Sequence, residues 1–326
     1  MIHGATLSRR ARRCVGPAGP GVPPVVTALR GPHWWIRGAT PPSRGGGDVV
    51  SEDPVEQPAP VVRPEVWETY GPADLSAVPV FAGGFINFGY WHSVDLERPL
   101  SQEDRIRSEQ DLYRHVLDAV APDGGRAVEI GCGLGLGCAL ALDEYGPATV
   151  TGVDIHPQQL RRAREANSPL LAARPQRLRF VLGAAESLPL GDAEFDCLYS
   201  VEAVQHFPDL PAFAREAARV LRPGGRVAVA GFFSVEGAPA PEERLAGLLE
   251  TFASGLDIAR PVSRLAQALA EAGFGDVRAD SIGRQVWPGW DRWLARLWEP
   301  GTWPRNFMAA WEQQILDYYL ITAARP

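Results

Sequence analysis

Lysine is absent from this chain of 326 residues, so all 32 basic residues are arginine. Chemistry through a Schiff-base lysine is therefore excluded, and a Walker-type phosphate loop would lack its usual lysine. Glycine and proline are abundant instead, at 34 and 30 residues, beside much alanine and arginine. This composition is most simply a GC-rich coding bias and carries no direct functional information.

Cysteine is also scarce, with residues at 14, 132, 138 and 197 and no CxxC or zinc-type spacing. Such sparse use favours a reducing compartment, and we expect Cys132, Cys138 and Cys197 to be buried because they lie in apolar runs. No apolar stretch reaches the ~18 residues that a membrane-spanning helix needs. We therefore expect a soluble, cytoplasmic protein without a membrane partner.

Charge is distributed unevenly along the chain. Residues 1–47 contain seven arginines and no acid, and the formal net charge is −7, which leaves −14 on the remainder. Nucleic acid is not expected as a partner, because phosphate binding needs a basic face. The length suffices for one large domain or two modest ones with a sizeable core.

Residues 1–64 have the composition of a disordered extension. Pro and Gly recur without helical or strand periodicity, and such a segment buries too little apolar surface to offset the entropy of ordering. It lacks the apolar stretch of roughly 7–15 residues that a signal peptide has, and it has few serines. We expect a dispensable or wrongly assigned start, in which Trp34–Trp35 is the one feature suited to docking.

From residue 126 to residue 236, apolar strand-like runs alternate regularly with helical stretches. The strands are expected at 127–132, 149–155, 179–183, 195–201 and 226–233. The intervening helices are expected at 135–145, 157–167 and 210–221. Because apolar strands that alternate with helices are buried on both faces, this pattern predicts an α/β fold with a doubly wound parallel sheet.

Two other regions flank this core. Residues 65–125 are expected to form an N-terminal helical region, with an amphipathic helix at about 101–121. Residues 237–326 are expected to form a C-terminal cap and the closing strands of the sheet. Its elements are helices at 241–256 and 262–272, a strand near 276–281 and a last strand at 317–325.

The segment that indicates chemistry is Glu129-Ile-Gly-Cys-Gly-Leu-Gly-Leu-Gly137, between the first strand and the first helix. Glycines let the backbone approach a ligand, and a helix N-terminus presents free N–H groups to an anion. The dinucleotide spacing G-x-G-x-x-G fails, because Leu136 or Cys138 would occupy its last position. Asp154, which ends the next strand, is placed to hold both ribose hydroxyls of a nucleoside; the alternative is a cap for the helix at 157–167.

Over about residues 80–326 the chain resembles the class I S-adenosylmethionine-dependent methyltransferases. The resemblance rests on five ordered motifs: EIGCGLGLG (129–137), GVDIHPQQL (152–160), GAAESLPL (183–190), FDCLYSVEAVQHFPD (195–209) and VLRPGGRVAV (220–229). It implies a Rossmann-like methyltransferase sheet with an N-terminal helical lid and a C-terminal helical, Trp-rich substrate cap. S-adenosylmethionine would be the cofactor, with its methionine end on the glycine loop, its ribose on Asp154 and its adenine beside Ala185 and Glu186.

The cofactor-binding residues that the resemblance implies are Tyr90, Glu129, Gly131, Cys132, Gly133, Asp154, Ile155, Gln159, Ala185, Glu186, Val201 and Gln205. The chain departs from the family at Ala184, where many relatives carry Asp, which leaves the adenine amino contact to Glu186 or to backbone. It departs again at Gly231, where some sugar O-methyltransferases have an acid that assists or binds metal. We therefore expect no metal.

Three segments are similar to small-molecule methyltransferases of antibiotic biosynthesis, of the macrolide-sugar and rifamycin O-methyltransferase type: FINFGYW (85–91), VWPGWDRWLARLW (286–298) and DYYLITAARP (317–326). Prenyl-chain and indole-terpenoid C-methyltransferases share the first element. The resemblance implies that residues 85–91, including Asn87, belong to a lid over cofactor and substrate. The alternative is a hydrophobic staple. A lid of this kind can be exchanged between subunits of a homo-oligomer, and the sequence leaves the oligomeric state open.

The substrate pocket is expected to include Phe85, Trp91, Glu202, Trp287 and Trp290. Six of the ten tryptophans lie in residues 287–311, where they form either an aromatic wall for a bulky acceptor or a helix packed on the core. His206 follows the fourth strand, where the cleft should open, and is the candidate general base for an alcohol nucleophile. The alternative for His206 is a purely structural cap of its loop.

The leading hypothesis is O-methylation of a hydroxyl group on a sugar or polyketide-type natural product. N- or C-methylation of an aromatic, alkaloid or prenyl acceptor is the alternative, because such acceptors need no strong base. A non-catalytic cofactor-binding scaffold is a third reading, against which the intact glycine loop and Asp154 argue. The glycine spacing disfavours a nicotinamide oxidoreductase.

Overall fold

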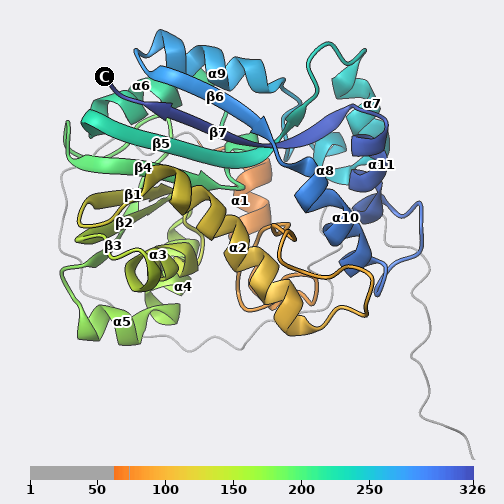
Figure 1. Cartoon of the computed structure of the whole chain (residues 1–326), viewed down its shortest axis with the longest axis horizontal. Helices are drawn as coiled ribbons and strands as arrows, with labels where there is room; N and C mark the ends of the chain where they lie inside the picture. Colours follow the sequence, from red (N-terminus) through yellow and green to blue (C-terminus); the bar gives the residue numbers. More distant parts are fainter. Residues whose placement is uncertain (1–61, 73) are drawn as a thin grey trace, which may run out of the picture.

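The computed structural model describes residues 62–72 and 74–326, and a seven-stranded sheet organises them (Figure 1). The strands are β1 (Arg126–Ile130), β2 (Thr149–Asp154), β3 (Leu178–Leu182), β4 (Phe195–Val201), β5 (Leu221–Ser234), β6 (Gly275–Ser281) and β7 (Leu316–Ala324). Their spatial order is β3-β2-β1-β4-β5-β7-β6. Strands β1 to β5 pair in parallel, whereas β7 runs antiparallel to β5 and β6. The expected α/β sheet is confirmed, with one reversed strand.

Helices cover both faces of the sheet and one of its ends. They are α1 (Pro64–Tyr70), α2 (Gln102–Val120), α3 (Leu136–Glu144), α4 (Pro157–Ala166), α5 (Ser168–Ala173), α6 (Leu210–Val220), α7 (Pro241–Leu248), α8 (Glu250–Ala253), α9 (Val262–Glu271), α10 (Gly283–Leu294) and α11 (Asn306–Glu312). Figure 1 shows α2 crossing one face, α6 and α9 above β5 and β6, and α7, α8, α10 and α11 gathered at the right.

The two faces have separate hydrophobic cores because successive strand residues point in opposite directions. Ala127 packs with buried residues of α2, α3 and α10, whereas its neighbour Val128 packs with those of α6 and α9. The buried Cys132, Cys138 and Cys197 are free thiols, which confirms the expectation for these three residues. Within the described ranges, no helix is long and apolar enough to cross a membrane.

Helix α2 shows how the sequence sets the local structure. Ser101 caps its N-terminus by accepting from the backbone N–H of Asp104, while the Asp104 carboxylate accepts from the N–H of Ser101. This capping box satisfies two donors that a helix start leaves free. Leu112 and Val116 lie on the apolar face and are completely buried. The helix then ends at Ala121 in a left-handed conformation, φ 44°.

Residues 1–61, which include Trp34–Trp35 and most of the expected extension, lie outside the described part of the chain. The short helix α1 begins at Pro64, where the fixed φ of proline suits the first helical turn. Arg162 of α4 holds its C-terminal end by donating to the carbonyls of Tyr70 (3.1 Å) and Gly71 (2.9 Å). These contacts place α1 beside the carboxyl ends of the central strands.

Candidate active site

A cavity lies at the carboxyl ends of β1, β2 and β4. The sheet order reverses between β1 and β4, and ligands of open α/β sheets bind at such a switch point. Helix α1 and residues 84–86 complete the lining beside the strand ends. We call this space the cofactor cavity.

The glycine loop forms one wall of the cofactor cavity. Gly131 and Gly133 have φ of 77° and 51°, a region in which side-chain-bearing residues are strained. A Cβ on Gly131 would overlap that of Ala203, whereas a Cβ on Gly133 would meet no atom within 4 Å. Glycine at 133 therefore leaves the backbone open to the cavity, as a bound cofactor requires.

Asp154 ties this loop to the start of α4. Its Oδ2 accepts from the N–H of Gly133 (2.9 Å) and its Oδ1 from the N–H of His156 (2.8 Å). The helix cap is His156, whose Nδ1 accepts from the N–H of Gln158, so Asp154 is not the cap of α4. Burial raises the pKa of Asp154 to about 6, against the opposing effect of the two N–H groups. Its carboxylate lines the cavity and keeps lone pairs free for two hydroxyl donors.

Glu129 does not line the cofactor cavity, contrary to its assignment as a cofactor-binding residue. Its carboxyl is completely buried beneath the loop and accepts from Tyr113 (3.0 Å) and from the thiol of Cys138 (3.0 Å). Burial raises the pKa of Glu129 to about 7. This acid therefore positions Tyr113, which does line the cavity.

Glu186 supplies an acceptor without a partner in the described chain. Its Oε1 is buried, accepts no hydrogen bond and belongs to a residue of the cavity lining. Burial also raises the pKa of Glu186. A buried acceptor without a donor is costly, and the amino group of an adenine would satisfy it. The donors and acceptors of this cavity therefore fit a nucleoside with a free amino group.

His206 follows β4 in a short 3₁₀ turn, Val204–His206, and lies in the cavity wall. Its Nε2 is 2.8 Å from the hydroxyl of Tyr70, on α1. Its Nδ1 is 3.1 Å from the carbonyl of Leu256 and 3.3 Å from Oδ1 of Asp257. A carbonyl only accepts, so Nδ1 carries the proton and Nε2 is the basic nitrogen. Burial lowers the pKa of His206 to about 4.

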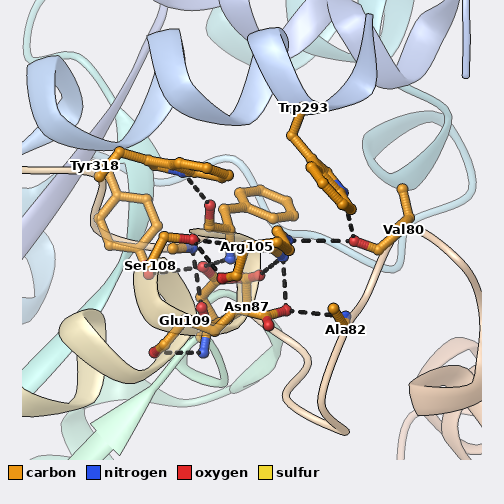
Figure 2. A network of polar contacts seen from close by, with 12 residues as sticks. Val80, Ala82, Asn87, Arg105, Ser108, Glu109, Trp293 and Tyr318 are labelled. Atoms are coloured by element: carbon orange, nitrogen blue, oxygen red, sulfur yellow. Dashed lines mark hydrogen bonds and ion pairs between the residues drawn. The ribbon is translucent and has the colours of Figure 1, made fainter. Parts of the chain in front are cut away.

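A buried polar network fixes residues 80–91 against α2 (Figure 2). Arg105 is completely buried, pairs with Glu109 at 2.9 Å and donates to the carbonyls of Val80 and Asn87. The indole of Trp293 donates to the same Val80 carbonyl at 3.0 Å, which ties α10 to this segment. Residues 80–91 are therefore an anchored wall, and their position depends on buried hydrogen bonds.

Most sequence-predicted site residues meet at the cofactor cavity. Its lining includes Phe85, Gly131, Cys132, Gly133, Asp154, Ile155, Gln159, Ala185, Glu186, Val201, Glu202 and His206. Gln205 lines a second cavity instead, which Glu202 and His206 share. Sequence reasoning missed Val66 and Tyr70, because the seven residues of α1 are too few to give a periodic signal. It also assigned Arg63 to the disordered extension 1–64, which is wrong at its end, because Arg63 lines the cavity and donates to the carbonyls of His206 and Leu256.

Four predicted aromatic residues lie in neither cavity. Tyr90 stacks on His115 of α2, with ring centroids 4.4 Å apart. The indole of Trp91 donates to the Phe88 carbonyl, and its side chain is buried against Gly289. Trp287 stacks on Phe307, and Trp290 on Phe88. Because these contacts fill the space between α10 and the sheet, the Trp-rich helix is a packed one and not the wall of either cavity.

A switch-point cavity with an open glycine loop, an acid that ends β2 and a free buried acceptor defines a Rossmann-like protein that binds a nucleoside-containing cofactor. Comparison with known proteins narrows this class. Residues 128–229 match the family model described as "Methyltransferase domain".

Among curated relatives, the chain is 31% identical to methyltransferase GfsG of Streptomyces halstedii, over 80% of this chain and 94% of that protein. It is 30% identical to erythromycin 3''-O-methyltransferase of Saccharopolyspora erythraea, over 66% of this chain and 70% of that protein. Two further curated relatives are 35% and 33% identical to this chain, but the chain covers only 50% and 59% of their length.

Among solved structures, the fold is similar to geranyl diphosphate C-methyltransferase from Streptomyces coelicolor A3(2), with a TM-score of 0.64 and 17% identity. That likeness covers 74% of this chain and 91% of the other. The chain belongs to the class I S-adenosylmethionine-dependent methyltransferases. S-adenosylmethionine is the cofactor of this family, and Asp154, Gly133 and Glu186 line the cavity at the switch point.

Proposed function

We propose that this chain methylates a hydroxyl group of a small secondary metabolite, of the sugar or polyketide type, with His206 as the general base. The observation that supports this proposal most directly is the basic Nε2 of His206 at the wall between the cofactor cavity and the second cavity. Relatives named as O-methyltransferases, that of erythromycin among them, favour an oxygen acceptor.

When bound, the cofactor supplies a methyl group on a positively charged sulfur. The chain contributes alignment, exclusion of water and a proton acceptor. Asp154 and the glycine loop hold the nucleoside and amino-acid ends, while Phe85 and Ile86 give the cavity an apolar wall. These groups act by position, so the acceptor oxygen must be held in line by the rest of the site.

His206 is uncharged at neutral pH because its pKa is lowered to about 4. A base of this pKa is weak, but the acceptor oxygen becomes strongly acidic once a methyl group has been added to it. A neutral imidazole therefore suffices to take the proton. On this account turnover decreases only when the pH falls towards about 4, since protonation of Nε2 abolishes the base.

Tyr70 occupies Nε2 in the present arrangement, at 2.8 Å. Either the acceptor hydroxyl replaces Tyr70 at this nitrogen, or its proton passes through the tyrosine hydroxyl. Tyr70→Phe separates the two arrangements. Replacement predicts that turnover is retained in this variant, whereas passage through the hydroxyl predicts a loss as large as that of His206→Ala.

The test of the proposed base is His206→Ala, measured as turnover with an identified acceptor and as cofactor affinity by calorimetry. Turnover should decrease by about 10²–10⁴-fold with little change in cofactor affinity. His92→Ala, which removes an exposed histidine, is the matched control and should leave both unchanged. A decrease smaller than tenfold contradicts the general-base role and favours N- or C-methylation.

A further inference from the structure

A second cavity adjoins the cofactor cavity. Tyr70, Ile86, Glu202 and His206 line both spaces and therefore form the partition between them. Its remaining lining comes from segments far apart in the chain, including β5, α8 and α11. We call it the acceptor cavity, because a molecule held there would meet the cofactor across His206.

Apolar and aromatic side chains form the body of the acceptor cavity. Four phenylalanines line it, at positions 81, 88, 232 and 307, together with Leu75 and Leu256. Phe88 and Phe232 stack with ring centroids 5.6 Å apart, and each also contacts Phe307. All six side chains are buried. The body of a molecule bound here must therefore be apolar, since these walls offer no hydrogen bonds.

Polar groups gather at the end of the cavity nearest His206. The amide nitrogen of Gln205 donates to the carbonyl of Glu202 (2.8 Å), which leaves the amide oxygen Oε1 buried and without a donor. The hydroxyl of Thr251 is likewise buried and lies beside the carboxyl of Asp257, whose pKa it lowers. Both side chains are 6% exposed. An acceptor without a donor is best satisfied by a ligand that donates, such as a hydroxyl group.

This polar end offers no positive charge to an anion. Two carboxyl groups, of Glu202 and Asp257, lie in the lining, and burial raises their pKa values to about 8 and about 7, so neither can pair with a phosphate group. No arginine of the described chain lines this cavity, and the sequence has no lysine. The nearby Arg63 is engaged by the carbonyls of His206, Gly255 and Leu256. Phosphate recognition needs cationic or N–H donors, which are missing here.

We infer that the acceptor cavity selects an acceptor without a phosphate group: a molecule with an apolar body and a hydroxyl group at the polar end, beside Gln205 and His206. This inference rests on the proposed function and adds the chemistry of the acceptor to it. The enzyme of similar fold is named for geranyl diphosphate, which is an anion. The inference predicts that this chain takes a different class of acceptor.

The test compares two probes that share one hydrocarbon and differ in the head group: geraniol and geranyl diphosphate. Binding to the full chain is measured by equilibrium dialysis at saturating S-adenosylhomocysteine, whose own binding is determined first by calorimetry. Geraniol should bind at least tenfold more tightly than geranyl diphosphate. Diphosphate binding as tight as that of geraniol overturns the inference.

Two failures remain distinguishable in this design. If S-adenosylhomocysteine does not bind, the proposed function itself is wrong. If it binds and geraniol does not, the second cavity is not an acceptor site and the inference alone is overturned.

Variants assign the hydroxyl contact. Gln205→Leu and Thr251→Val remove two buried polar groups of this end, and each should weaken geraniol binding by about 3–10-fold, as expected for one hydrogen bond of ~0.5–1.5 kcal/mol. Affinity for S-adenosylhomocysteine should not change, because both residues line only the acceptor cavity. Gln267→Leu, on the exposed surface of α9, is the matched control. Unchanged geraniol binding in two folded variants contradicts the assignment.

Discussion

Arg105→Met tests whether the buried network in Figure 2 holds residues 80–91 in place. Arg105 and Glu109 have no exposed side-chain surface, and the guanidinium nitrogen lies 2.9 Å from the carboxyl oxygen. Arg105 also donates to the carbonyls of Val80 and Asn87. Methionine retains much of the apolar stem and supplies no donor, so the substitution removes the polar contacts with little change in packing.

The expected cost follows from what each partner of Arg105 can do. The Asn87 carbonyl loses its donor in a buried setting, which gives a loss of about 1–3 kcal/mol in the free energy of unfolding, whereas the Val80 carbonyl keeps the indole N–H of Trp293 as its donor. Glu109 adds little at pH 7, because burial has already raised its pKa to about 8 and it is mostly protonated. For a domain of this size, each kcal/mol corresponds to a decrease in Tm of roughly 2–4 °C.

The destabilisation by Arg105→Met should also depend on pH. The Arg105 charge lowers the pKa of Glu109, so the pKa rises further in the variant. A buried acid whose pKa is raised on folding loses stabilisation as the pH rises from its unfolded to its folded pKa. In the variant this loss continues to higher pH, so its destabilisation relative to the parent should grow above about pH 8.

Urea unfolding followed by tryptophan fluorescence measures both effects, and calorimetry with S-adenosylmethionine adds the functional one. Cofactor affinity should also fall, because Phe85 and Ile86 belong to the displaced segment. Arg107→Met, exposed on the same helix, should remain within ~0.5 kcal/mol of the parent. A loss below 1 kcal/mol for Arg105→Met, or one that is independent of pH, refutes the reasoning.

Three further predictions concern cofactor binding, packing and the N-terminus. Asp154→Asn should weaken S-adenosylmethionine binding more than tenfold, and affinity of the parent should decrease as the pH falls through about 6, where Asp154 is protonated; unchanged calorimetric affinity contradicts the ribose assignment. Gly137→Ala should lower the free energy of unfolding by ~1–3 kcal/mol, because its Cβ would overlap the ring of Tyr113. Gly247→Ala in α7 is the control, because its added Cβ would have no atom within 4 Å, and it should be neutral or stabilise by up to ~1 kcal/mol. If urea unfolding shows Gly247→Ala to be the more destabilised of the two variants, the packing around Gly137 is misread. Deletion of residues 1–60 should leave Tm and cofactor affinity unchanged, and a large decrease in either is the contrary result.

The parts of the site that could be predicted from sequence are local. Apolar runs that alternate with helices, the glycine loop and Asp154 were recognisable because each depends on neighbours within a few residues. The cofactor cavity indeed has Gly131, Gly133 and Asp154 in its lining. The elements between 102 and 324 also start and end close to their expected bounds.

The aromatic residues could not be placed in this way. Trp287 and Trp290 have a spacing that suits both a packed helix and a pocket wall, and only their contacts with Phe307 and Phe88 decide between the two. Helix α1 was not predicted from the sequence, for a different reason. It is too short for a periodic signal, and distant groups such as Arg162 hold it in place.

The sequence alone therefore determined the fold class, the cofactor loop and the presence of His206 after the fourth strand, because residue spacing and residue type indicate each of them. The tertiary structure decided that β7 lies reversed between β5 and β6 and that Glu129 is buried beneath the loop. It also decided the protonation of His206, because the carbonyl of Leu256, 50 residues away, accepts a hydrogen bond from Nδ1–H and burial keeps the ring neutral. Hydrogen-bond partners and desolvation arise only from groups that folding brings together.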